Sequence, residues 1–304
     1  MSIQLIAKFH LVFAALVLST ACQAACSPQG LRVQQLISIK ENKFEVPENI
    51  NIDELALAMT SCLGNANPKI RDDIAFSSLQ AWMRNKKLAS QTVHSLYENL
   101  TNELNSHQPD KTGFKKPFVA LTLSEVARYD RLNSNLSHEE QVALVNAAVD
   151  YMNDIKDFRG FNSREGYRHA VAHTADLMLQ LSLNKSIEKQ QLDQMLAAIS
   201  SKLIATGEHT YVYGEPGRLM APVFYIARRE LHSETEWKTW FTNIASPKPF
   251  SSWNEALTTQ PGWSHRLNSE TFLMMMYVNV NESDNTKLKS ILLPAITDAI
   301  KSMP

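Results

Sequence analysis

The sequence predicts an all-α fold of stacked antiparallel helical pairs, either a HEAT-like α-solenoid or an α/α superhelix. Apolar residues recur with helical spacing in successive segments, and capping residues or helix breakers separate these segments. Only nine glycines occur in the 304 residues, and nearly all of them fall between the apolar segments. The Asn-Gly and Asp-Gly pairs typical of tight hairpins do not occur in the sequence. Helices with well-marked ends therefore fit the pattern better than strands.

The N-terminus has the layout of a secretory signal, because a charged start precedes the short apolar run Leu11–Leu18 and small residues follow. This run is too short to span a bilayer. We therefore expect residues 1–24 to be a signal peptide and residues 25–304 to form one helical repeat-like domain. The mature chain would be periplasmic or secreted, without a transmembrane segment. A lipid anchor on Cys22 is the weaker alternative, since Ser19 stands where an aliphatic residue is usual.

Removal of the signal would leave two cysteines, Cys26 and Cys62, in an oxidising compartment. A disulfide between them would fix the N-terminal arm to the first long helix. The alternative is two unpaired thiols, because spacing alone does not reveal whether the geometry allows a bond.

The helices are expected in order along the chain. Asp53 and Glu54 suit the first turn of the first one, and Pro68 opens the second. Ser137 and Glu140 form a capping box at the start of the fifth. The segment 245–265 contains three prolines and is the least clearly helical. The expected helices span residues 52–63, 68–85, 90–104, 118–129, 137–155, 167–183, 186–205, 216–231, 233–244, 268–280 and 286–302.

A coarse internal repeat emerges when every second helix is aligned on a basic residue near its start. These residues are separated by 45, 52, 50 and 48 positions, a period that suits two-helix repeats. The alternative is that basic residues fall at helix starts by chance. The aligned residues are Arg71, Lys116, Arg168, Arg218 and Arg266.

The most informative segment runs from Gly166 to Gln180, where three polar residues interrupt an otherwise small or apolar helix. At about 100° per residue, His169, His173 and Asp176 fall within one stripe. The remaining circumference is apolar, so we expect a helix buried nearly all round whose stripe faces a cleft or a polar interior.

One interpretation of the stripe is a metal site. Histidines at positions i and i+4 can present ring nitrogens to one ion, and a carboxylate one turn later can complete three ligands. His169, His173 and Asp176 would then bind a divalent metal, with Asp157 or Glu215 supporting them. The absence of a Glu directly after His169 argues against a metalloprotease. Outside this interpretation, no cofactor is expected.

A second interpretation is a metal-free catalytic site, in which His169 or His173 acts as acid or base and Asp176 orients it. Arg159, Arg168 or Arg218 would hold an anionic substrate. Helical lyases and hydrolases of polysaccharides offer an analogy, and a concentration of tryptophans offers a floor for a sugar. Core packing is the alternative for these tryptophans, and also for the run Met274–Met276. The tryptophans are Trp237, Trp240, Trp253 and Trp263.

The third interpretation, which we favour, is a buried polar network that joins neighbouring helices. His169, His173 and Asp176 would form it with Asp157 and Arg159. The protein would then bind or scaffold a protein, peptide or glycan ligand rather than catalyse a reaction. The formal net charge is −1 and the sequence has no long run of basic residues, so we do not expect a nucleic-acid partner.

Several motifs resemble the signature of a bacterial family, the domain of unknown function 2785 family. Asp157–Gly160 is followed by Gly166–His173 and by Ala175–Leu177, and Phe118–Leu123 lies upstream. The resemblance also includes Asp130 and the segment from Glu215 to Leu219, so it covers most of the mature chain. It implies a helical fold and a shared motif but no activity. The chain departs from the family pattern at Tyr167 and Arg168, where the pattern has Trp-Ala, and this departure suggests an altered rim of the site.

Overall fold

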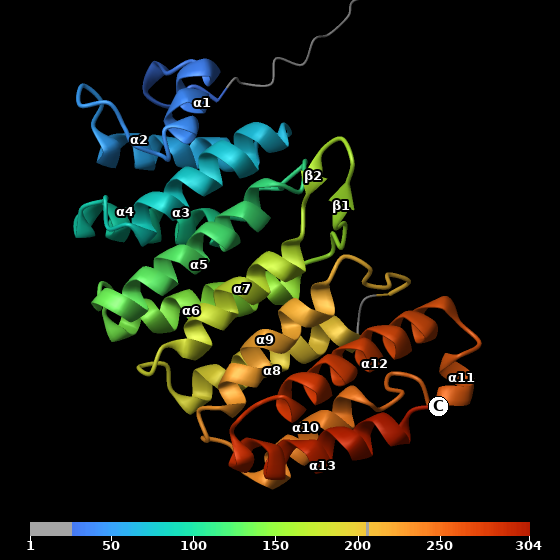
Figure 1. Cartoon of the computed structure of the whole chain (residues 1–304). Coiled ribbons are helices and arrows are strands. Elements are labelled where there is room, and N and C mark those ends of the chain that lie inside the picture. The colour runs from blue at the N-terminus through green and yellow to red at the C-terminus, as the bar shows by residue number, and fades with distance from the viewer. Residues whose placement is uncertain (1–25, 205–206) are drawn as a thin grey trace, which may run out of the picture.

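A computed structural model describes residues 26–204 and 207–304 of the chain. It confirms an all-α fold, with one two-stranded hairpin among the described elements. Figure 1 shows the helices stacked one upon another from the N-terminal to the C-terminal end. None of the described helices is long and apolar enough to cross a membrane. The α-helices are α1 (Val33–Glu41), α2 (Ile52–Met59), α3 (Ser77–Arg84), α4 (Ser90–Asn105), α5 (Lys115–Asn133), α6 (His138–Asp154), α7 (Ala170–Leu183), α8 (Lys189–Ile204), α9 (Glu215–Ala227), α10 (Glu234–Ile244), α11 (Trp253–Ala256), α12 (Gln260–Asn281) and α13 (Thr286–Ser302).

Shorter elements complete the array. The hairpin consists of β1 (Phe161–Asn162) and β2 (Gly166–Tyr167), which lie between α6 and α7. The 3₁₀ segments are η1 (Pro28–Gly30) and η2 (Thr60–Gly64), and the π-helical segment η3 (Lys69–Phe76) leads directly into α3.

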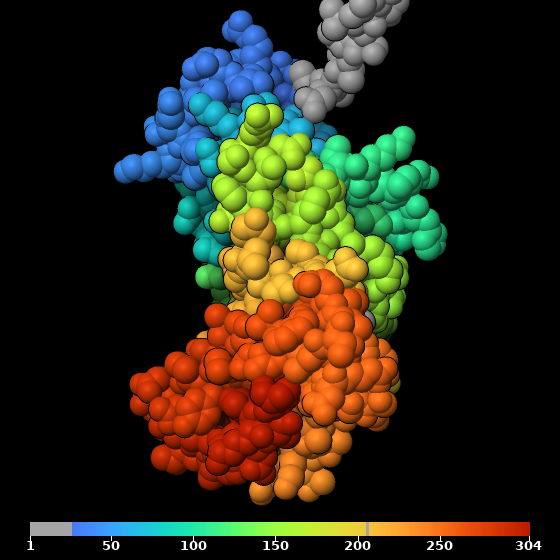
Figure 2. Space-filling view, turned by 90° about the vertical axis from the view of Figure 1, so that its right-hand side faces the viewer, coloured from blue at the N-terminus to red at the C-terminus, as the bar shows by residue number. Residues whose placement is uncertain are grey.

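The helices alternate between two layers. One layer contains α3, α5, α7, α9 and α12, each packed against the next, and we call it the inner layer. The other contains α4, α6, α8, α10 and α13. Counted from η3, which leads directly into α3, the inner elements begin at residues 69, 115, 170, 215 and 260, so successive starts are 45 to 55 positions apart, close to the expected period. Figure 2 shows the stack in profile, with a hollow on its left-hand side between the blue and red ends.

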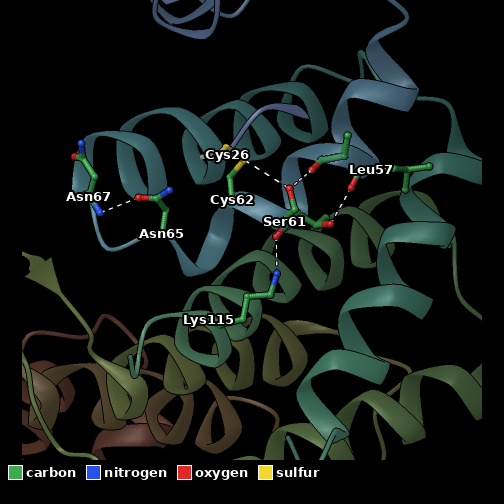
Figure 3. Close-up of a disulfide and its surroundings, with 9 residues drawn as sticks. Cys26, Leu57, Ser61, Cys62, Asn65, Asn67 and Lys115 are labelled. Atoms are coloured by element: carbon green, nitrogen blue, oxygen red, sulfur yellow. Dashed lines mark hydrogen bonds between the residues drawn. A yellow bond between two sulfur atoms is a disulfide. The ribbon is translucent and has the colours of Figure 1, made fainter. Parts of the chain in front are cut away.

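A disulfide joins Cys26 to Cys62, as the sequence predicts (Figure 3). The two Cα atoms are 5.3 Å apart, and the bond closes a loop between residues 36 positions apart. It attaches the N-terminal arm to η2, where Lys115 of α5 donates to the carbonyl of Thr60. The predicted signal peptide and Cys22 lie outside the described residues.

Helix ends follow the local chemistry, with two corrections. The predicted capping box of α6 is present, since Ser137 and Glu140 bond each other's backbone N–H groups. Helix α12, however, begins eight residues before the predicted start, because Thr259 caps it and Pro261 occupies its first turn. The prediction was also wrong for α7, which begins at Ala170 and not at Tyr167.

Basic side chains close helix C-termini repeatedly. Lys116 donates to the carbonyls of Leu104 and Ser106 at the end of α4. Arg266 donates to the carbonyl of Pro304, just beyond α13, and Lys202 caps the end of α6 in the same way. Because the last carbonyls of a helix have no intrahelical partner and carry partial negative charge, a cation there stabilises the helix end. Capping thus explains one residue of the aligned basic series, Lys116, whereas the carbonyl bonded by Arg266 lies beyond the C-cap of α13.

The buried carboxylate of Asp130 joins α5, α6 and α7, which belong to both layers. It accepts hydrogen bonds from the backbone of Leu136, from Gln141 of α6 and from Asn184 at the end of α7. Since a buried carboxylate needs several donors, this network fixes the relative positions of α5, α6 and α7.

The predicted core residues divide between interior and surface. Trp237 and Met276 are buried, as expected for core side chains. Met274, Met275 and Trp263 are exposed along α12, so the assignment of the whole Met274–Met276 run to the core was wrong. Only one face of α12 packs against neighbouring helices, so helical spacing decides which methionine of the run is buried.

Candidate functional site

The segment that carries the predicted stripe is built differently from a continuous helix. Gly166 and Tyr167 belong to β2, which pairs with β1. His169 is the N-cap of α7 and has a left-handed backbone, with φ 55° and ψ 39°. Its amide donates to the carbonyl of Arg159, which extends the hairpin. The side chain of His169 is therefore placed by a hairpin and a helix start together.

A buried arginine holds this hairpin against the first helical pair. Arg71 is 0% exposed and donates to the carbonyls of Glu165 and Tyr167. Its guanidinium lies 4.0 Å from the ring centroid of Phe114, and the guanidinium of Arg168 lies 4.1 Å from the same centroid. Cation–π contacts of this kind are strong where water is excluded.

Three exposed rings form a cluster beside His169, and we call them the aromatic rim. Tyr167 lies 4.9 Å from Phe161 and 4.5 Å from His169, measured between ring centroids. Tyr213 lies 6.4 Å from Phe161. A side chain at Gly160 would overlap the ring of Tyr213, so glycine is required for this close approach. Figure 2 shows the yellow-green hairpin beside the amber segment that follows α8, on the face turned toward the viewer.

Beneath the rim, His169 faces Glu215, the first residue of α9. The distance from His169 Nε2 to Glu215 Oε1 is 3.6 Å, and neither atom has a hydrogen-bond partner among the described residues. The other carboxylate oxygen accepts from the amide of Tyr213. Burial lowers the pKa of His169, although Glu215 opposes this effect, so the imidazole is neutral near pH 7.

His173 lies one turn further along α7 and is also buried. Its ring centroid is 5.8 Å from that of His169 and 4.9 Å from that of Phe118. Burial lowers the pKa of His173 well below its ordinary value, and the neighbouring His169 and Arg218 add to the effect.

Asp176 turns toward Arg218 of α9 and forms an ion pair with it. Burial raises the pKa of Asp176, while Arg218 opposes this shift and nearby Glu125 adds to it. Glu125 of α5 is itself buried and accepts two hydrogen bonds from Arg84 of α3. Glu125 on α5 and Asp176 on α7 are thus each paired with an arginine from the next helix of the inner layer, α3 and α9 respectively.

These four helices enclose a polar pocket of about 330 Å³. Each helix contributes at least one charged or hydrogen-bonding side chain, and His173 and Asp176 lie in the wall of the pocket. We call it the inner-layer pocket. Its other lining residues are Phe76, Gln80, Arg84, Leu121, Ser124, Glu125, Leu179, Gln180 and Arg218.

The comparisons with known proteins give a family but no activity. The family described as "Protein of unknown function (DUF2785)" matches residues 100–278, which is more than half of the chain. The chain belongs to this family. No curated protein matches the sequence, and no solved structure matches the fold. The part matched to DUF2785 includes the hairpin, the aromatic rim, His169, His173 and Glu215.

The structure brings some of the predicted site residues together and separates others. His169, His173 and Glu215 are neighbours, and Asp176 lies with Arg218 in the pocket wall. Asp157 and Arg159 instead pair with each other in the loop before the hairpin, and Arg168 pairs with Glu165 and donates to the carbonyl of Thr112.

The three expected metal ligands do not fit one ion in this arrangement. Asp176 is engaged by Arg218, and His169 faces Glu215. Across residues 26–204 and 207–304, no group of three or more His, Cys, Asp or Glu side chains is placed to hold a metal ion. A metal bound by His169, His173 and Asp176 would require Asp176 to leave its arginine.

Sequence reasoning missed several residues of the site. The sequence indicates Arg71 only through the repeat, and no local pattern marks Phe114, Glu125, Arg84 or Tyr213 as site residues. One signal was present for Tyr213, since it lies two residues before Glu215 in a segment that the family resemblance already marked.

The neutral state of His173 predicts a pH dependence of stability. The unfolded chain binds a proton on this side chain near pH 6.5, and the folded chain does not, so stability is lost as pH falls below 6.5. Between pH 7.5 and pH 5.5 the loss is about 1.4 kcal/mol for one such histidine. We expect urea unfolding of His173→Gln to show a smaller loss than wild type. His138→Gln, at an exposed position, should retain the wild-type loss; equal losses in all three proteins would contradict a neutral His173.

Proposed function

We propose that this protein is a binding protein of the periplasm or extracellular space, and that it holds its ligand in the inner-layer pocket and at the adjoining aromatic rim. The observation that carries the proposal is the pocket wall, to which four successive inner helices contribute charged side chains. Solenoids characteristically bind ligands on the extended surface formed by one face of their repeats. The predicted signal peptide and the Cys26–Cys62 bond support an oxidising compartment.

The state of the polar groups supports binding over catalysis. Arg84 and Glu125 satisfy each other, as do Asp176 and Arg218, so the pocket presents fixed, paired charges. Paired and hydrogen-bonded side chains are held in place, and a preorganised surface loses less entropy when a ligand binds. A ligand of about the pocket's size would meet hydrogen-bonding groups on several sides.

The test is a pocket-blocking variant. Panels of short peptides and of oligosaccharides would be screened against wild type by thermal shift, and stabilising compounds measured by calorimetry. Gln180→Trp fills the pocket from α7, and Gln190→Trp places the same side chain on the exposed face of α8. We expect Gln180→Trp to bind about tenfold more weakly or worse, and Gln190→Trp to bind like wild type. Unchanged binding to Gln180→Trp, or no stabilising compound in either panel, would refute the proposal.

A second candidate is an enzyme of the hydrolase or lyase type that acts on a glycan or another anionic substrate. The observation that favours it is a pair of opposite pKa shifts in one segment: burial lowers the pKa of His169 and raises the pKa of Asp176, which is paired with Arg218. Product analysis after incubation with oligosaccharides tests this candidate. Turnover that is lost in His169→Gln and retained in His138→Gln would favour it over simple binding.

A further inference from the structure

We infer that the aromatic rim is a platform for an uncharged pyranose ring of an oligosaccharide. This inference rests on the proposed binding function and adds the class of ligand. Phe161, Tyr167 and Tyr213 are 44%, 42% and 43% exposed, although they lie beside the buried residues His169 and Glu215. Flat rings exposed in a group present apolar faces that the C–H face of a sugar ring can cover.

The backbone that carries the platform is fixed by several contacts. The Phe161–Tyr167 strand pair carries two of its rings, and Arg71 binds this hairpin from below. The third ring, that of Tyr213, lies against Gly160, and its backbone amide is bound by Glu215. Because the backbone that carries the rings is fixed before binding, only side-chain rotations remain to be ordered when a ligand stacks on them.

Unpaired polar atoms beneath the platform point to hydroxyl groups. His169 and Glu215 have side chains that are 10% and 2% exposed, and their facing atoms Nε2 and Oε1 lack hydrogen-bond partners among the described residues. In a neutral imidazole one ring nitrogen is a donor and the other an acceptor, and in either role Nε2 of His169 can bond a hydroxyl group.

Neither of these two atoms has a hydrogen-bond partner in the part of the chain that the structure describes, so each can still bond a hydroxyl group of a ligand. Two neighbouring hydroxyl groups of a sugar can bond one of these atoms each, and the same sugar offers an apolar face to the rings. The ring of Tyr167 covers His169, so its side chain must turn aside to admit these hydroxyls. Side-chain rotations of this size are common when ligands bind.

The charges around the platform favour an uncharged ring over an acidic one. Arg159 pairs with Asp157, Arg168 pairs with Glu165, and Arg218 pairs with Asp176. The arginines described around the rim are therefore already neutralised, whereas the unpaired oxygen of Glu215 would repel a sugar carboxylate.

The experiment uses the full mature chain and four named probes. Cellotetraose, chitotetraose and maltotetraose are uncharged, and tetragalacturonate is acidic; their dissociation constants are measured by calorimetry. We expect at least one uncharged tetrasaccharide to bind, and Phe161→Ala and Tyr213→Ala each to weaken it about tenfold. Tyr277→Ala removes an equally exposed ring from α12 and should have no effect.

Glu215→Gln tests the hydroxyl site separately from the rings. The new amide can accept from the Tyr213 backbone and donate to His169 Nε2, which satisfies both atoms internally. We expect this variant to keep its melting temperature and to lose tenfold or more in affinity for the tetrasaccharide. Wild-type affinity in this variant would overturn the assignment of the hydroxyls.

Other results overturn the inference without touching the proposed function. If peptides bind in a manner sensitive to Gln180→Trp and no tetrasaccharide binds, the binding function stands and the sugar platform falls. Tighter binding of tetragalacturonate than of every uncharged probe would refute the uncharged ring. Equal affinities of wild type, Phe161→Ala and Tyr213→Ala would place the sugar elsewhere.

Discussion

Replacement of Arg71 by methionine should lower the free energy of unfolding by about 3–5 kcal/mol. The side chain is completely buried, and its ion-pair partner Asp72 would be left without a countercharge. The carbonyls of Glu165 and Tyr167 would also lose their donor. Urea denaturation followed by circular dichroism measures the change.

A matched variant separates this effect from the general loss of an arginine. Arg164→Met lies in the turn of the same hairpin, and its side chain is exposed, so we expect a change within about 0.5 kcal/mol. A drop of less than about 1 kcal/mol for Arg71→Met would mean that the hairpin is held by other contacts.

Loss of the Cys26–Cys62 bond should lower the free energy of unfolding by about 4 kcal/mol. The bond joins residues 36 positions apart, and closing a loop of that length in the unfolded chain removes entropy of this order. Cys26→Ser removes the bond and leaves the buried Cys62 as a free thiol. Urea unfolding of the wild type with and without a reducing agent gives the comparison.

The reducing agent provides its own control. It should lower the stability of wild type to that of Cys26→Ser and leave Cys26→Ser unchanged. Equal stability of oxidised and reduced wild type would show that the bond does not constrain the unfolded chain, and would weaken the argument for an oxidising compartment.

Helical periodicity predicted the fold well because it is a local property. Apolar spacing and capping residues act within one or two turns, and the Ser137–Glu140 box occurs where the sequence predicts it. The start of α7 was predicted wrongly because Tyr167 and His169 also fit a helical stripe. Only the pairing of β2 with β1, and the left-handed backbone at His169, end that pattern.

The site was predicted in part for a related reason. His169, His173 and Asp176 share a short segment, so their proximity is visible in the sequence. Glu125 and Arg71 act across 40 or more positions, through Arg84 and the hairpin respectively. Contacts between residues so far apart in the sequence depend on how the helices stack, and no local pattern encodes them.

The hairpin contact of Arg71 changes how the array should unfold. In a simple solenoid each repeat touches only its neighbours, so terminal repeats can melt one after another. Arg71 lies in η3, just before the first inner helix, whereas the hairpin lies just before α7, the third inner helix, so this contact joins elements on either side of α5 in the stack. The N-terminal pairs are therefore joined into one cooperative unit, and any ligand that steadies the hairpin also protects the start of the chain from unfolding.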